Sequence, residues 1–486
     1  MSGSPRGRQG VTFAVLAISV SSFALLQSLI VPVLARIQVE YDTDQTTVTW
    51  VLTAYLLSAS ICTPLLGRVG DAIGKKRVLV LTLGALSLGS LAAALAPSIG
   101  WLIAARVLQG AGGGVLPLSF GIIRDEFQDR VTSALSVIAS LTAVGFGVGI
   151  VVAGPIVSGL GYHWLFWLPF LVTAVSTLAA ALLIPDSPVR TPGRLPVLPA
   201  VLLAGWLVAL LVALSEGNDW GWLSVRILAL LATAGVVVAA WVAVEQRVPV
   251  PMIDMRMMRL RGIWTTNLVA GCIGFGMFAS FGFLPQFLQT PASAGYGFDA
   301  SISESGHLLL PSAVASFLVG FTTARLIRAV GARAVIMSGT LATATAFLSM
   351  ALFHDRTWQL YAATTVQGIG SGLVFSSLAG VVIAAVPREQ TGVASGMNAN
   401  IRTIGGSIGS AVMAGVVTAR VSDAGIPLES GYTLGFTLLS VGMVLAAVAA
   451  AFIPELDHQT TDNRLEDADN AELGMVAGAP ALTPSD

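Results

Sequence analysis

The sequence predicts an all-α integral membrane protein with fourteen transmembrane helices. Of its 486 residues, 55% are hydrophobic and only 10% are charged, which is too apolar for a soluble chain of this length. The apolar residues gather into fourteen runs of about 20 residues or more, the length at which a helix crosses the hydrocarbon core of a bilayer. These runs are residues 11–35, 49–70, 78–97, 101–123, 132–158, 164–185, 195–214, 223–244, 263–289, 303–327, 334–353, 358–386, 396–419 and 432–453.

The distribution of basic residues predicts the orientation of these helices. If the N-terminus is cytoplasmic, 19 of the 25 Lys and Arg residues lie in the segments on that side or at the adjoining ends of the runs. Four lie on the outer side, and two, Arg106 and Arg402, lie deeper within runs. Cytoplasmic loops of membrane proteins carry such an excess of positive charge. We therefore expect a multi-pass protein of the cell membrane with both termini in the cytoplasm.

The two ends of the chain differ from the apolar runs. Residues 1–10 carry Arg6 and Arg8 and lead into the first run without a small-residue cleavage pattern, so we expect a cytoplasmic N-terminus followed by a retained first span. Residues 454–486 are polar and acidic, which predicts a disordered cytoplasmic tail.

Internal repeats predict how the spans are grouped. The segment that begins with Gln109 recurs at Gln367, an offset of 258 residues, and the pair Gly145 and Gly149 recurs 260 residues later. We expect two six-helix bundles related by parallel duplication, residues 11–185 and 263–453, with a central two-helix insertion at 195–244. Transporters built this way hold their substrate between the two bundles, near the middle of the membrane.

A polar, cationic turn separates the second and third runs. Three glycines allow close helix packing there, and Asp71 can lie at a helix N-terminus and pair with one of the following basic side chains, Lys75 included. The residues that we expect to act in this turn, which we call the latch, are Gly67, Asp71, Gly74, Lys76 and Arg77. In the second half of the chain Ala324 and Arg328 occupy the positions of Gly67 and Asp71.

The fourth run contains Arg106 and, one turn later, Gln109. A guanidinium group within a membrane costs several kcal/mol unless it faces a polar cavity or a partner, which makes Arg106 a candidate functional residue. The alternative is an arginine that extends to the membrane surface, because Trp101 lies close by in the sequence.

The fifth run has a glycine-rich face that includes the pair Gly154-Pro155. Proline interrupts helical hydrogen bonding and glycines permit close approach, so this helix is expected to pack tightly and bend. The alternative is a packing face without a functional role. The candidate gating residues are Gly149, Gly154, Pro155 and Gly159.

The latch, the segment that follows Arg106 and the Gly154-Pro155 motif together resemble the fourteen-span drug:proton antiporter family of the major facilitator superfamily, the EmrB/QacA-like multidrug efflux transporters. The resemblance covers Val11 to Pro454. It implies secondary active efflux of hydrophobic or cationic small molecules, such as drugs and antibiotics, in exchange for protons. It also implies that Arg106 faces a central cavity, that the proton gradient is the energy source without a cofactor, and that the protein works as a monomer in the lipid bilayer.

The first run departs from that family, because Gln27 stands where an aspartate is usual. An amide does not titrate, so a proton carrier has to lie elsewhere. The candidate acids are Glu216, Asp219, Asp71 and Glu304, and His307 is a further candidate because it can titrate near neutral pH. The loss of the acid also leaves open a dedicated metabolite exporter or facilitator without proton coupling.

Arg402 in the thirteenth run has two interpretations: a cation in the cavity or gate, or an anchor at the cytoplasmic rim. Other function classes find no support. No ATP-binding loop, nucleophile elbow or metal cluster is recognisable, nucleic acid is not indicated, and an enzyme is not expected. A membrane sensor or scaffold would tolerate changes at Asp71, Arg106 and Pro155.

Overall fold

The computed structural model describes residues 5–43, 45–127, 130–186, 197–248, 251, 253–387, 390–419, 422 and 426–454. Residues 455–486 of the expected tail lie outside this range, as does most of the segment between the first bundle and the insertion. The first half of the chain forms α1 (Pro5–Leu29), η1 (Val31–Val33), α2 (Leu34–Glu40), α3 (Gln45–Ile73), α4 (Lys75–Ala94), α5 (Ile99–Gln109), η2 (Gly110–Gly114), α6 (Val115–Glu126), α7 (Val131–Leu160) and α8 (Trp164–Leu183). The remainder forms α9 (Val197–Trp220), α10 (Val225–Glu245), α11 (Met255–Met258), α12 (Arg261–Gln289), η3 (Ala292–Ala294), α13 (Ile302–Leu352), α14 (Thr357–Ala384), α15 (Thr391–Thr418) and α16 (Glu429–Ala450).

The prediction of an all-helical membrane protein is confirmed, but the number of spans differs. Among the described residues, 13 helices are long and apolar enough to cross a membrane, against the fourteen expected. The difference arises in α13, whose 51 residues cover two predicted runs. Gly331 interrupts it with φ 82° and ψ 153°, a conformation open to glycine but strained for other residues. The predicted fourth span is also irregular, because the glycines of η2 separate α5 from α6.

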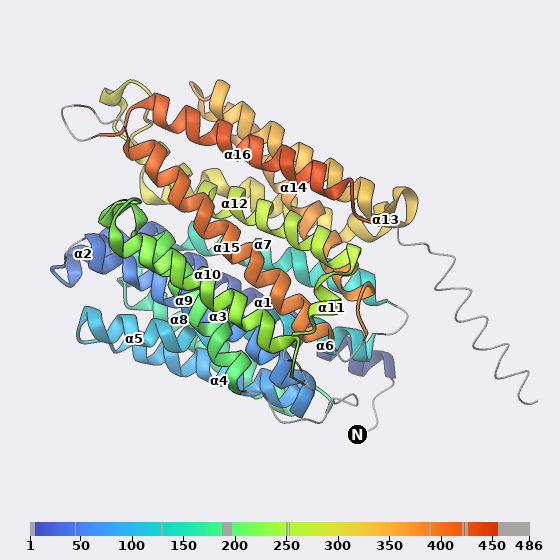
Figure 1. Ribbon diagram of the computed structural model, residues 1–486. Coiled ribbons are helices and arrows are strands. Elements are labelled where there is room, and N and C mark those ends of the chain that lie inside the picture. Colours follow the sequence, from blue (N-terminus) through green and yellow to red (C-terminus); the bar gives the residue numbers. More distant parts are fainter. Residues whose placement is uncertain are drawn as a thin grey trace, which may run out of the picture. The chain divides into compact units, whose positions relative to one another are not determined.

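The helices pack in groups that follow the chain. In the first part α1 packs on α7 and α8, and α4 packs on α5 and α8; in the last part α13 packs on α14 and α16, and α12 on α15. The groups are joined mainly by α7, which packs on α13 and α14, and by α15, which packs on α3 and α6. Figure 1 shows these helices running roughly parallel or antiparallel to one another.

The two helices of the expected insertion pack beside the α3–α15 contact. α9 touches α3, α10 and α15. Leu203 and Trp206 of α9 and Trp241 of α10 share a buried apolar cluster with Val393 and Met397 of α15. The insertion therefore covers one seam between the two groups.

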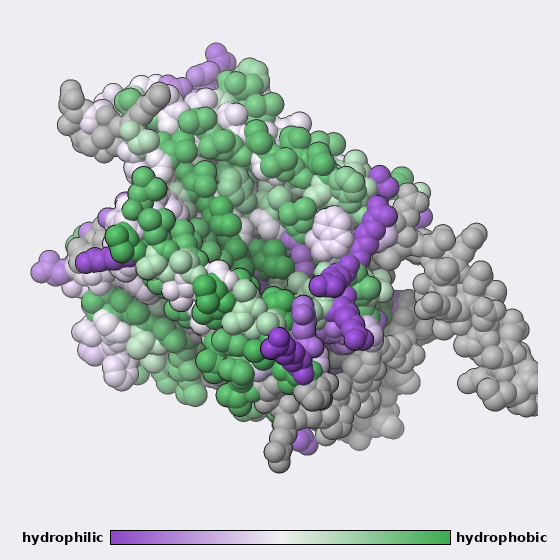
Figure 2. All heavy atoms as spheres, viewed as in Figure 1, coloured by the Kyte–Doolittle hydropathy of each residue, from purple (hydrophilic) through white to green (hydrophobic). Residues whose placement is uncertain are grey.

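Much of the outer surface is apolar, as in a protein surrounded by lipid. Leu81, Val175, Leu182 and Val201 are each at least 60% exposed. In Figure 2 apolar side chains cover the visible face across α10, α15 and α16, and hydrophilic ones gather mainly at its ends. The start of α1 and the end of α16 lie at the same end of the molecule (Figure 1). We call it the latch end, because α3 meets α4 there.

Candidate functional site

The latch joins the two groups of helices through glycines. A Cβ atom on Gly67 would lie 2.6 Å from the backbone oxygen of Gly392 in α15, and one on Gly392 would lie 2.8 Å from the backbone oxygen of Gly67. Gly396 packs in the same way on Pro64 of α3. Close approach of this kind requires residues without side chains. The latch ends of α3 and α15 are therefore in backbone contact.

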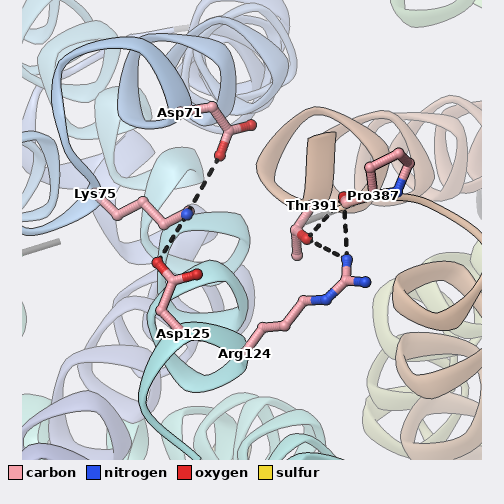
Figure 3. A network of polar contacts seen from close by, with 6 residues as sticks. All are labelled: Asp71, Lys75, Arg124, Asp125, Pro387 and Thr391. Atoms are coloured by element: carbon pink, nitrogen blue, oxygen red, sulfur yellow. Dashed lines mark hydrogen bonds and ion pairs between the residues drawn. The ribbon is translucent and has the colours of Figure 1, made fainter. Parts of the chain in front are cut away.

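A buried chain of charges lies beside this contact (Figure 3). The ammonium group of Lys75 is 3.8 Å from Asp71 and 2.8 Å from Asp125 of α6, and all three side chains are at most 3% exposed. Asp71 belongs to the last turn of α3, and the helix N-terminus that its carboxylate faces is that of α15, close to Gly392. The partial positive charge at that N-terminus favours a carboxylate.

The sequence did not identify Arg124 as a site residue, although it lies at the centre of the second contact in Figure 3. From α6 its guanidinium donates to the carbonyl oxygens of Val386 (2.8 Å) and Pro387 (3.1 Å) and to the Thr391 hydroxyl (2.5 Å). These acceptors belong to the connection between α14 and α15 and to the first residue of α15. In the sequence Arg124 was visible only as one of many basic residues at the ends of spans.

The other predicted latch residues have different positions. Gly74 caps α4 with φ 112°. Lys76 is partly exposed and lies 3.6 Å from Asp186, whose side chain is 71% exposed. Arg77 is exposed. In the second half of the chain, Arg328 stands at the position that corresponds to Asp71. It is also exposed, so it takes part in no buried ion pair there.

Arg106 is fully buried among α3, α4 and α5. Its Nε donates to the Val51 carbonyl oxygen (3.0 Å) and its Nη1 to Gln109 Oε1 (2.7 Å). Gln109 in turn donates to Ser90 of α4 (3.0 Å), and the guanidinium lies 4.2 Å from the ring centre of Tyr55. Arg106 therefore does not reach the membrane surface. On the side toward the centre of the molecule, its guanidinium group contacts the ring of Tyr55.

The glycines of α7 face two different helices. Gly145 and Gly149 pack on α1, whereas Gly147 and Gly154 pack on α13. The helix continues through Pro155 from Val131 to Leu160 without interruption. A side chain at Gly159 would meet no atom within 4 Å. Of the predicted gating glycines, Gly149 and Gly154 lie in these contacts, whereas Gly159 has open space beside it.

This difference between Gly149 and Gly159 predicts a difference in stability. In Gly149→Ala the new methyl group would lie 2.7 Å from the backbone oxygen of Leu25 and closer still to the Ser28 hydroxyl. We expect a loss of about 1–3 kcal/mol for this overpacking. Gly159→Ala should be neutral or slightly stabilising, because alanine favours a helix by about 1 kcal/mol over glycine. Thermal unfolding of both variants in detergent tests this, and equal effects would contradict the packing.

Three adjoining cavities lie between the two groups of helices, with volumes of about 20, 70 and 120 Å³. We call them together the interface cavity. Arg402 and Thr142 line the first two, and Gln27, Phe146 and Phe278 line the second and third. Its walls come from α1, α3, α6 and α7 on one side and from α12, α14 and α15 on the other.

The structure separates the predicted coupling residues. Arg402 and Gln27 line the interface cavity, and so does Tyr55, which stacks on Arg106. Arg106 does not line it. Gln27 is absent from the hydrogen-bond partners of Arg106, which are Val51 and Gln109.

Glu216 lies apart, on α9, and is only 4% exposed. Its neighbours attach α9 to both groups of helices: the Ser215 hydroxyl is 3.0 Å from that of Thr53 in α3, and Asn218 donates to the Ala411 carbonyl oxygen of α15. Within the described part of the chain, the Glu216 carboxylate has no hydrogen bond or ion pair.

Two further titratable candidates are at the surface. Glu304 and Ser301 form a capping box at the start of α13, in which each side chain bonds the backbone N–H of the other. His307 is exposed one turn further along.

Comparison with known proteins places this geometry among transporters. The family model described as Major Facilitator Superfamily matches residues 16–291 and 266–482. The chain is 30% identical to the methylenomycin A resistance protein of Streptomyces coelicolor over 91% of its own length and 93% of that protein. It is 27% identical to the puromycin resistance protein of Streptomyces alboniger, with coverage of 92% and 90%, and 27% identical to the multidrug transporter protein MdtP of Bacillus subtilis, with coverage of 76% and 69%. A crystal structure of the human organic anion transporter MFSD10 has the same fold, with a TM-score of 0.67 at 19% identity, and covers 92% of this chain and 100% of that one.

Proposed function

The chain belongs to the Major Facilitator Superfamily, a family of membrane transporters and not of enzymes, and from this premise we propose that it exports hydrophobic small molecules from the cell in exchange for protons. The observation that carries the proposal is the interface cavity, which is lined by both groups of helices and is rich in aromatic side chains. A cavity of that kind binds amphipathic molecules of several shapes. The resistance and multidrug transport proteins similar to this chain favour export over uptake.

We propose that the polypeptide crosses the membrane fourteen times. The residues of α13 before and after Gly331, 302–330 and 332–352, are each long enough for one crossing of about 20 residues. Counting them separately restores two six-helix bundles, residues 11–185 and 263–453, around the insertion at 195–244. The excess of basic residues at the latch end favours a cytoplasmic location for that end and for both termini.

Transport would proceed by rocking of the two bundles around the interface cavity. The latch end is closed by the contact of Gly67 with Gly392 and by the hydrogen bonds of Arg124. These contacts would have to break before a substrate could enter from the cytoplasm. The glycine contacts of α7 with α13 would allow the bundles to turn against each other with little steric hindrance.

Proton coupling requires a titratable group within the moving parts, and we assign it to Glu216. Glu216 is only 4% exposed, and it lies on the helix whose neighbouring side chains bond to both α3 and α15. The surface positions of Glu304 and His307 make them less suited to sense the movement of the bundles.

We expect Glu216→Gln to abolish the dependence of export on the pH gradient. The measurement is efflux of a fluorescent hydrophobic dye from proteoliposomes with and without an imposed gradient. The wild type should respond at least tenfold to the gradient and the variant should not. Glu304→Gln is the matched control, because it is the same exchange at an exposed carboxylate away from α9.

The outcomes separate the candidate functions. Movement in the wild type that ignores the gradient would replace the antiporter with an uncoupled facilitator, which the glutamine at position 27 favours. A gradient response that survives in Glu216→Gln would place the proton carrier on another residue.

A further inference from the structure

The interface cavity contains one kind of charge. Arg402 is the single side chain that carries a charge at neutral pH among the described residues that line its three parts, and neither Asp nor Glu is present. The remaining walls are mostly aliphatic and aromatic, with Phe146, Phe278 and Phe281 around the third part. A molecule that enters this space meets a positive charge in apolar surroundings.

The guanidinium group of Arg402 has no counter-charge. It lies 4.9 Å from the ring centre of Phe375, and within the described residues it has no hydrogen bond and no ion pair. A stacked ring leaves the N–H groups at the edge of the guanidinium plane available for an acceptor. Arg106, the other arginine within a span, has its hydrogen bonds to Val51 and Gln109 instead.

The other polar side chains of the cavity are partly engaged, and among the described residues the hydroxyl groups of Tyr55 and Ser395 have no hydrogen-bond partner. The hydroxyl groups of Thr63, Thr142 and Thr403 donate to carbonyl oxygens of their own helices. Asn398 donates to the Thr266 carbonyl oxygen and to Asn267.

Gln27 has no hydrogen bond among the described residues and lines the same middle cavity as Arg402. Arg402 and Gln27 belong to opposite groups of helices, α15 and α1. These two side chains are therefore available to a ligand that contacts both groups.

We propose that the substrate is an amphipathic organic monoanion, such as an aryl carboxylate, whose charged group pairs with Arg402 and whose apolar body lies among the phenylalanines. A guanidinium fork matches the two oxygens of a carboxylate, and the pair is strengthened where water is excluded. A cation placed in the same cavity would be repelled by an uncompensated positive charge. This inference rests on the proposed export function and narrows it, because it removes the cationic molecules that the sequence led us to expect.

The test uses three probes that share one ring system and differ in charge: 1-naphthoate, 1-naphthamide and 1-naphthylmethylammonium. Full-length protein is purified and binding is measured by equilibrium dialysis, and transport is measured in proteoliposomes. We expect 1-naphthoate to bind at least tenfold more tightly than 1-naphthylmethylammonium. Arg402→Gln should remove that preference, and Arg402→Lys should retain part of it.

Folding of the variants is checked independently of the charge. Arg402→Gln should elute and melt like the wild type and should bind the neutral 1-naphthamide equally well. A variant that fails this check is replaced by Arg402→Lys, for which a loss of affinity for 1-naphthoate with unchanged affinity for 1-naphthamide supports the proposal.

The proposal is overturned if 1-naphthylmethylammonium binds as tightly as 1-naphthoate, or if Arg402→Gln leaves the binding of 1-naphthoate unchanged. Export itself is judged by gradient-driven efflux of the hydrophobic dye. Binding of 1-naphthoate that depends on Arg402 without any gradient-driven efflux would support the anion site and reject the exporter. Gradient-driven efflux without a preference for the anion would support the exporter and reject the anion site.

Discussion

Replacing Lys75 with methionine is expected to lower the free energy of unfolding by about 3–5 kcal/mol, because it removes the buried ammonium group that lies between two buried carboxylates. The side chains of Asp71 and Asp125 are 0% and 3% exposed, and Lys75 lies between them. Their mutual repulsion should also separate α6 from the α3–α15 contact and open the latch end. The measurements are thermal unfolding in detergent and accessibility of a cysteine introduced at Thr391 to a water-soluble thiol reagent.

The adjacent lysine is the matched control. Lys76→Met removes a pair with Asp186 at the surface, and exposed pairs contribute only about 0–1 kcal/mol. The triple variant Asp71→Asn, Lys75→Met, Asp125→Asn should recover most of the lost stability, since it removes the charges together. Equal effects of Lys75→Met and Lys76→Met would show that the buried chain of charges does not hold the latch.

Replacing Arg106 with alanine is expected to reduce efflux to the background of empty liposomes. The change removes the group that joins α5 to the Val51 carbonyl oxygen, to Gln109 and to the ring of Tyr55. Gln109 would keep only its hydrogen bond to Ser90. Tyr55, which lines the interface cavity, would lose its contact with the guanidinium group. Loss of a buried, hydrogen-bonded charge from such a network costs about 3–5 kcal/mol.

Arg106→Lys distinguishes charge from geometry. A lysine keeps the positive charge, but its compact ammonium group does not reproduce the planar fork or the stacking on Tyr55. We expect a folded protein with efflux reduced at least tenfold. Val107→Ala, at an exposed neighbouring position, should change the stability by less than about 0.5 kcal/mol. Normal efflux by Arg106→Ala would exclude a role for this network in transport.

The sequence was sufficient to predict the class of protein, the positions of most of the helices and the close packing of Gly67. Helices that cross a membrane need long apolar runs, and those runs are a local property of the chain. The close contact of Gly67 and the packing of Gly149 and Gly154 follow from residue type, because only small residues allow helices to approach so closely. The two halves of α13 were also predicted as separate runs, although a single glycine connects them without a loop.

Only the tertiary structure decided which side chains pair with each other across the fold. Local spacing allowed Lys75, Lys76 or Arg77 to pair with Asp71, and we named Lys76 and Arg77 as the acting residues. The structure has Lys75 there instead, because Lys75 also pairs with Asp125, which lies 50 residues further along the chain. The hydrogen bonds of Arg124 reach more than 260 residues away, to the connection between α14 and α15 and to Thr391.

Arg402 shows the same limit most clearly. In the sequence a rim anchor and a cavity cation were equally consistent with its position. In the fold, Gly392 and Gly396 allow one part of α15 to pack closely on α3, and Gly405 and Gly409 allow another part to pack closely on α12. The face left between these contacts turns Arg402 toward the interface cavity. The direction of a side chain on a helix depends on which faces its neighbours cover, and the neighbours of α15 come from both ends of the chain.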